Sequence, residues 1–150
     1  MKLITILFCF IYVMGQSQSD TAIPPEPELV SMNDTNVKYG GQYGQQYFEK
    51  GNDEPYTGFL CARYDNGELE SVQQFVDGVC NGIWIDYDPD GRKRLQGTMV
   101  NNRTEGPVTL FYEDGSVKAK GEYMHWRKSI GWWTFYDRKG NVVSKRRFTR

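Results

Sequence analysis

The sequence predicts an all-β protein, built as a single-layer antiparallel β-meander of about four hairpin repeats. The first observation is a glycine that recurs at Gly58, Gly82, Gly106 and Gly131, in steps of 24, 24 and 25 residues. The second is another glycine nine residues into every unit, and the third is an alternation of apolar and polar residues between these glycines. Matching registers at one period indicate a repeat protein.

Each unit contains a turn signal between two strand-like segments. Asn-Gly and Asp-Gly pairs supply the positive φ that tight hairpin turns need. A tyrosine lies shortly before each turn glycine, so we expect every unit to form one hairpin. The positions that define the repeat are the turn glycines Gly67, Gly91, Gly115 and Gly140 and the tyrosines Tyr64, Tyr87, Tyr112 and Tyr136.

The segments beside the turns alternate with a period of two. Before the turns, Leu60, Ala62 and Tyr64 share one parity in the first unit, as Ile83 and Ile85 do in the second. After the turns, the other parity is polar and carries Glu70, Gln74, Arg94, Gln96, Lys118, Lys120 and Glu122. This pattern is typical of strands with one buried and one solvated face. We expect the repeat domain to span residues 45–150, with a first strand at 45–50.

Two of the units also resemble a known family. The segments Gly82-Ile-Trp-Ile-Asp-Tyr87 and Gly131-Trp-Trp-Thr-Phe-Tyr136, each followed by a turn, are similar to MORN-type repeats. They look most like the variant in YwqK-family antitoxin components of bacterial toxin–antitoxin systems, and the lead-in at residues 47–58 resembles the segment that opens those repeats. The resemblance implies an antitoxin or immunity role, in which a partner toxin is neutralised by direct contact. The repeat itself is a scaffold with many uses.

The N-terminal region predicts export and a tether. Lys2 precedes an apolar run of 12 residues at positions 3–14, which is too short to span a bilayer. We therefore expect a signal peptide at residues 1–15, with an uncleaved anchor as the alternative, and a periplasmic or secreted protein. Residues 16–44 are polar and contain several prolines, so we expect a flexible linker there.

Charge is distributed unevenly along the chain. Residues 16–115 carry 7 Lys+Arg and 17 Asp+Glu, whereas residues 116–150 carry 10 and 2. The basic end includes Lys145, Arg146 and Arg147. These cations fit a solvated edge strand that resists edge-to-edge pairing, a docking surface for an acidic partner protein, or contact with an anionic membrane surface or nucleic acid. Export argues against nucleic acid.

Export would permit a disulfide between Cys61 and Cys80, but the expected register opposes it. If Cys61 pairs with Val72 across the first hairpin, Val72 pairs near Ile83 in the next strand. Cys80 then lies three residues further along and on the other face of the sheet. Side chains that point apart cannot be bridged without backbone movement, so we expect no Cys61–Cys80 bond.

The sequence offers no constellation for catalysis, a metal or a cofactor. His125 is the only histidine, and no cysteine, serine or carboxylate motif accompanies it. Asp86, Asp88 and Asp90 surround a turn but lack the spacing of a calcium-binding loop, and turn chemistry explains them better. We therefore expect a non-enzymatic protein without a small-molecule substrate.

Aromatic residues mark the expected contact surface. Phe59, Trp84, Phe111 and Trp133 are expected to form a stripe on the sheet face opposite the tyrosines. Such a stripe can stabilise the sheet through cross-strand pairs or serve as a binding platform, because tryptophan concentrates binding energy. The expected function is an exported repeat protein that binds a partner protein through its curved sheet. The alternative is a cell-envelope structural or anchoring protein whose basic C-terminal repeat contacts anionic lipid or surface polymer.

Overall fold

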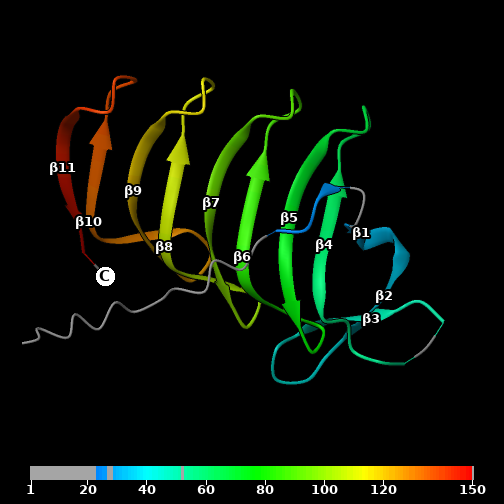
Figure 1. The fold of residues 1–150 in the computed structure, drawn as a ribbon. Helices are drawn as coiled ribbons and strands as arrows, with labels where there is room; N and C mark the ends of the chain where they lie inside the picture. Colours follow the sequence, from blue (N-terminus) through cyan, green and yellow to red (C-terminus); the bar gives the residue numbers. More distant parts are fainter. Residues whose placement is uncertain (1–22, 27–28, 52, 150) are drawn as a thin grey trace, which may run out of the picture.

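A computed structural model describes residues 23–26, 29–51 and 53–149 (Figure 1). The expected signal peptide at residues 1–15 lies outside the described residues. Nine strands form one sheet in the order β1-β4-β5-β6-β7-β8-β9-β10-β11, and β2 and β3 form a separate hairpin. The strands are β1 (Val30–Ser31), β2 (Thr35–Tyr39), β3 (Gln45–Glu49), β4 (Gly58–Arg63), β5 (Leu69–Val76), β6 (Val79–Tyr87), β7 (Lys93–Val100), β8 (Arg103–Phe111), β9 (Val117–Met124), β10 (Lys128–Tyr136) and β11 (Val142–Phe148).

The predicted meander of hairpins is confirmed. Each sequence unit forms one antiparallel hairpin, namely β4–β5, β6–β7, β8–β9 and β10–β11, and the hairpins follow one another side by side (Figure 1). The amide of each turn glycine donates a hydrogen bond to the carbonyl three residues earlier. The tyrosines join neighbouring units, because the Tyr64 hydroxyl donates to the Tyr87 carbonyl and the Tyr112 hydroxyl donates to the Tyr136 carbonyl, both at 2.9 Å.

The structure differs from the flexible linker expected over residues 16–44. Within that range, β1 pairs in parallel with β4, a 3₁₀ turn follows at Met32–Asp34, and β2 pairs with β3. Ile23 and Leu29 pack against the buried residues Phe59, Cys61 and Val72. A few well-placed apolar side chains thus hold a segment whose overall composition is polar. Among the described residues, no helix is long and apolar enough to cross a membrane.

The expected alignment of faces between the first two units is wrong, because Leu60 and not Phe59 lies on the face of Trp84. Leu60 lies opposite Gln73, which lies opposite Trp84, so Leu60 and Trp84 share one face of the sheet. Val108 and Trp133 pack in the same cluster as Trp84. We call this side, which carries the third residue of every unit, the groove face. The prediction aligned the faces of the units by their tyrosines. It failed because units two and four have one residue fewer between the first glycine and the tyrosine.

Both sides of the sheet are buried only near its N-terminal end. On the groove face, Leu60, Trp84, Val108 and Trp133 are at most 4% exposed. On the other side, which we call the reverse face, Cys61, Val72 and Ile85 are buried in the first two hairpins, whereas Trp132 in the last hairpin is 64% exposed. Part of the N-terminal segment therefore acts as a second layer for the first hairpins.

Cys61 and Cys80 are free and buried on opposite faces. Cys61 pairs with Val72 as predicted, but Val72 pairs with Ile85 and not with Ile83. This shift of two residues preserves the parity, so the conclusion about the cysteines is unchanged. Burial raises the pKa of the Cys80 thiol to about 12, which keeps it protonated at neutral pH.

Two glycines on the groove face let tryptophan rings lie against the neighbouring strand. A Cβ atom on Gly121 would lie 2.2 Å from Cδ2 of Trp133, and one on Gly97 would lie 3.2 Å from Cε3 of Trp84. Both contacts are with rigid rings inside the main hydrophobic cluster. Two atoms at 2.2 Å overlap, so a residue larger than glycine at position 121 would clash with the Trp133 ring.

We expect Gly121→Ala to lower the free energy of unfolding by about 1–3 kcal/mol, the usual effect of overpacking a core. Gly97→Ala serves as the matched control, because its ring contact can be relieved by a small shift, and it should have the smaller effect. Urea denaturation followed by tryptophan fluorescence measures both. Equal losses in the two variants would contradict the tight contact at position 121.

Aspartates close the turns of the repeat. The Asp88 and Asp137 carboxylates each accept two backbone amide hydrogen bonds, from the residues two and four positions later. Asp114 accepts from the hydroxyl and the amide of Ser116, and these bonds, with Arg138 nearby, lower its pKa from 3.8 to about 2. Turn formation therefore accounts for acidic residues at these positions.

No group of three His, Cys, Asp or Glu side chains within the described ranges could hold a metal ion.

The Asp114 carboxyl should titrate with a midpoint near pH 2 in the folded protein. A lowered pKa means that the carboxylate stabilises the fold above the unfolded pKa of about 4. This stabilisation should be lost as the pH falls through about 2. Carboxyl ¹³C NMR measures the midpoint, and Asp114→Asn should remove this titration. A midpoint near 4 would show that the turn bonds do not hold the charged form.

Candidate functional site

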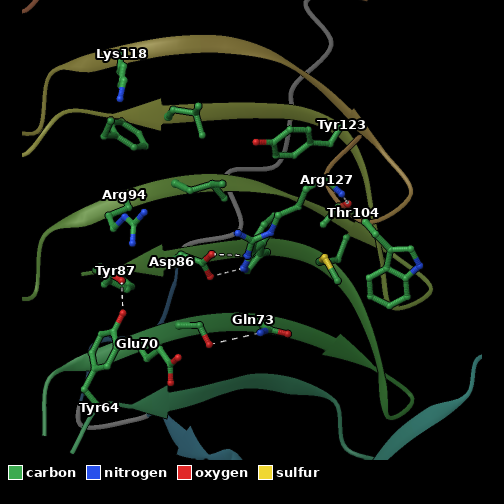
Figure 2. Close-up of a pocket in the computed structure, with 17 residues that line it drawn as sticks. Tyr64, Glu70, Gln73, Asp86, Tyr87, Arg94, Thr104, Lys118, Tyr123 and Arg127 are labelled. Carbon is green, nitrogen blue, oxygen red and sulfur yellow. Dashed lines mark hydrogen bonds and ion pairs between the residues drawn. The ribbon is translucent and has the colours of Figure 1, made fainter. Parts of the chain in front are cut away.

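A groove of about 780 Å³ crosses the groove face. Figure 2 shows that its lining side chains come from successive strands, and the residues lie on or next to β4 to β9 and on the loop that follows β9. Its floor combines apolar side chains with polar ones. The floor includes Ser71, Gln73, Trp84, Asp86, Leu95, Met99, Thr104, Leu110 and Tyr123.

Three charged residues reach the groove through β-bulges. Ala62 lies opposite Ser71 and Arg63 lies opposite Leu69, so Glu70 has no partner in the ladder. The same interruption leaves Arg94 and Lys118 unpaired at the equivalent places in the next two hairpins. A bulge adds one residue to a strand and redirects its side chain. Glu70, Arg94 and Lys118 therefore line the groove, although the sequence pattern had assigned them to the solvated face.

These three charges are not neutralised by neighbours. Within the part of the chain that the structure describes, the side chains of Glu70 and Arg94 have no hydrogen-bond or ion-pair partner. Lys118 only lies over the Tyr112 ring, at 5.7 Å from the ring centroid. Nearby Arg92 and Arg138, by contrast, form ion pairs with Asp88 and Asp114. The bulge charges are thus available to a ligand.

The loop between β9 and β10 is one residue longer than its counterparts. The β5–β6 and β7–β8 loops contain two residues each, whereas residues 125–127 form a three-residue loop. This extra residue accounts for the 25-residue step of the third unit. His125, Trp126 and Arg127 have φ values of +39°, +56° and +66°. Bulky residues rarely adopt this region, and strain of this kind clusters at functional sites.

Asp86 anchors this loop to the floor of the groove. Its Oδ2 accepts a hydrogen bond from Nη2 of Arg127 at 2.8 Å, and its Oδ1 accepts one from Nε1 of Trp84 at 2.6 Å. The Arg127 guanidinium lies 4.5 Å from the centroid of the Trp84 ring, in a cation–π contact. Oγ1 of Thr104 accepts from the Arg127 amide at 2.7 Å. Figure 2 shows this arrangement in the middle of the groove.

Trp126 lines both the groove and a second hollow of about 710 Å³. It is 73% exposed. The second hollow is lined by the 41–45 loop, and Gln73 and Met99 belong to both hollows. Asn102 fixes the 41–45 loop, because its Nδ2 donates to the carbonyls of Tyr43 and Gln45. The two hollows are therefore neighbours that share Gln73, Met99 and Trp126 in their linings.

The structure brings only part of the predicted aromatic stripe to one surface, because Trp84 and Phe111 both line the groove. Phe59 lies on the reverse face, Trp84 and Trp133 are buried in the groove-face cluster, and Phe111 lines the groove. The predicted cations Lys145, Arg146 and Arg147 are exposed on the outer strand β11, outside the groove. The sequence pattern did not identify five further residues of this surface, namely Glu70, Arg94, Lys118, Trp126 and Arg127.

We expect Asp86→Asn to loosen the 125–127 loop, because Arg127 loses its ion pair while Trp84 keeps an oxygen acceptor. Hydrogen exchange at the Arg127 amide should become faster, with a loss of unfolding free energy below about 1 kcal/mol, since the pair is partly exposed. Asp90→Asn removes an equal charge from an exposed turn and should leave this exchange unchanged. Unchanged exchange in Asp86→Asn would show that the loop is held elsewhere.

Comparison with known families identifies one of the hairpins. Residues 104–125, which cover β8, its turn and β9, match the family model described as MORN repeat variant. No curated protein and no solved structure matched the chain in the other two comparisons. The β8–β9 hairpin of this chain is therefore similar to the MORN repeat variant, and the other three hairpins carry the same pattern of glycines.

Proposed function

We propose that this protein is a non-enzymatic binder of a partner protein and that the groove, with Trp126 at its edge, is the contact surface. The observation that carries this proposal is the position of Trp126, which is 73% exposed on a loop of left-handed residues. An exposed tryptophan contributes little to the stability of the fold. At protein interfaces, by contrast, tryptophan and arginine often contribute a large share of the binding energy.

The surroundings of Trp126 support this proposal. Its neighbour Arg127 is held by Asp86 and by the Thr104 hydroxyl, so the loop is fixed before a partner arrives. A preorganised surface loses less entropy on binding than a flexible one. The uncompensated charges of Glu70, Arg94 and Lys118 add electrostatic selectivity along the same groove.

The more specific proposal is an antitoxin or immunity protein. It follows from the resemblance of the repeats to the YwqK-family variant, and the MORN repeat variant at residues 104–125 supports the repeat type. With the expected signal peptide at residues 1–15, the protein is exported, and the toxin that it neutralises acts in the periplasm or outside the cell.

The second candidate function is a cell-envelope structural or anchoring protein. The observation that favours it is the outer strand β11, where Lys145, Arg146 and Arg147 are exposed. None of the three has an ion-pair partner among the described residues. Clustered cations of this kind attract anionic lipid or surface polymer, and added salt weakens that attraction.

A pull-down from the native envelope with the purified protein distinguishes the two functions. We expect one protein to be retained in a stoichiometric complex at moderate salt, with retention reduced about tenfold by Trp126→Ala. Trp132→Ala is the matched control, because Trp132 is also exposed but lies on the reverse face. Retention that is insensitive to Trp126→Ala would reject the groove as the contact surface. Mixed lipid or polymer that salt removes would favour the envelope role.

A further inference from the structure

The charges of the three bulges form a ladder along the groove. Glu70, Arg94 and Lys118 follow β4–β5, β6–β7 and β8–β9 turns respectively, so each is two strands away from the next (Figure 2). Neighbouring strands lie about 4.8 Å apart, which places successive charges about 10 Å apart at the level of the backbone. The order of charges is negative, positive, positive.

A ligand in this groove lies across the strands. The lining residues run from the first hairpin to the third, so a ligand along the groove meets one charge of the ladder at each hairpin. Every strand from β5 to β9 is paired on both sides. The backbone groups of these strands are therefore used within the sheet, and a ligand cannot add to it as a further strand. Recognition must depend on side chains.

The spacing of the ladder fits a polyproline II helix better than a β-strand. A polyproline II helix has three residues per turn and a rise of about 3.1 Å, so residues three apart face the same side at about 9.3 Å. In a β-strand, residues three apart face opposite sides. An α-helix also returns to one side every seven residues, at about 10.5 Å. The spacing therefore allows a helix as well as a polyproline II segment, and the aromatic lining of the groove favours the polyproline type.

The rest of the groove suits the same conformation. Trp84, Phe111, Tyr123 and Trp126 line it together with the charges. Proline-rich segments bind to aromatic-lined grooves in general, because they are extended before binding and lose little entropy. The charges of the ladder then determine which such segment is selected.

We propose that the groove binds a polyproline-type segment of the partner protein, with two carboxylates three residues apart facing Arg94 and Lys118. A basic residue three positions before the first carboxylate faces Glu70. This inference rests on the proposed function, since it names the part of the partner that the groove recognises.

Synthetic peptides test the spacing. The probe is a peptide with the core Lys-Pro-Pro-Glu-Pro-Pro-Glu, and isothermal titration calorimetry at low salt measures its affinity for the full chain. We expect a peptide of the same composition with adjacent glutamates to bind about tenfold more weakly. A helix-forming peptide with glutamates seven residues apart should also bind more weakly. Equal or tighter binding of either comparison peptide would overturn the proposal.

Charge reversal assigns the contacts to residues. Arg94→Glu with Lys118→Glu should weaken binding of the probe about tenfold, and a probe with lysines in place of its glutamates should restore binding to this variant. Lys120→Glu is the matched control: it lies on the same strand as Lys118, two residues away, outside the groove and on the reverse face. Failure of the reversed probe to bind, or an equal effect of Lys120→Glu, would overturn the assignment.

The same variant separates this inference from the proposed function. If the wild-type protein and the double variant retain the same partner equally well in the pull-down, the ladder is not the recognition element, although the protein is still a binder. If the wild-type protein retains no partner protein, the proposed function fails, whatever the peptides show.

Discussion

A sheet with one layer has little apolar surface to bury, and this constraint governs the arrangement of the molecule. On the groove face the solution is a close contact between Trp133 and the Gly121 backbone, repeated more loosely by Trp84 and Gly97. Burial of a large ring against a neighbouring strand removes much apolar area from water without a second layer. Trp84 also needs a partner for its indole N–H, and Asp86 supplies it.

The groove follows from the same constraint. Because Asp86 satisfies Trp84, its second oxygen can hold Arg127 over the ring, and this contact shapes the 125–127 loop. In the last hairpin, Phe135 occupies the position equivalent to Asp86, and the Trp133 indole nitrogen has no hydrogen-bond partner among the described residues. The tryptophan in the middle of the sheet thus connects packing to a surface loop, whereas the one near the end serves packing alone.

The repeated glycines were sufficient to predict the hairpins, their order and the turns. They were not sufficient to predict which face each strand presents, because a bulge changes the relation between parity and face. Arg94 shows the difficulty: it alternates with Leu95 in the sequence, yet both line the groove. The strands within residues 30–39 were also missed, since β1 pairs with the distant strand β4 and β2 pairs with β3.

For the candidate site, one signal in the sequence was available. The 25-residue step of the third unit locates the extra residue of the 125–127 loop, but the length alone does not indicate what the loop contacts. The pairing of Asp86 with Arg127 joins residues 41 positions apart. No local pattern encodes such a contact, and it emerges only when the hairpins are placed side by side.

The bulges also separate two requirements that normally conflict in a sheet. Residues in the ladder must keep the pairing of the strands, whereas the bulge residue makes no ladder pair. The residues at positions 70, 94 and 118 can therefore vary with little effect on the pairing of the strands. Each of the first three hairpins contributes one such position to the groove, so duplication of such a hairpin would lengthen the groove by one step and add one independently variable position. Recognition in this architecture can diversify one hairpin at a time.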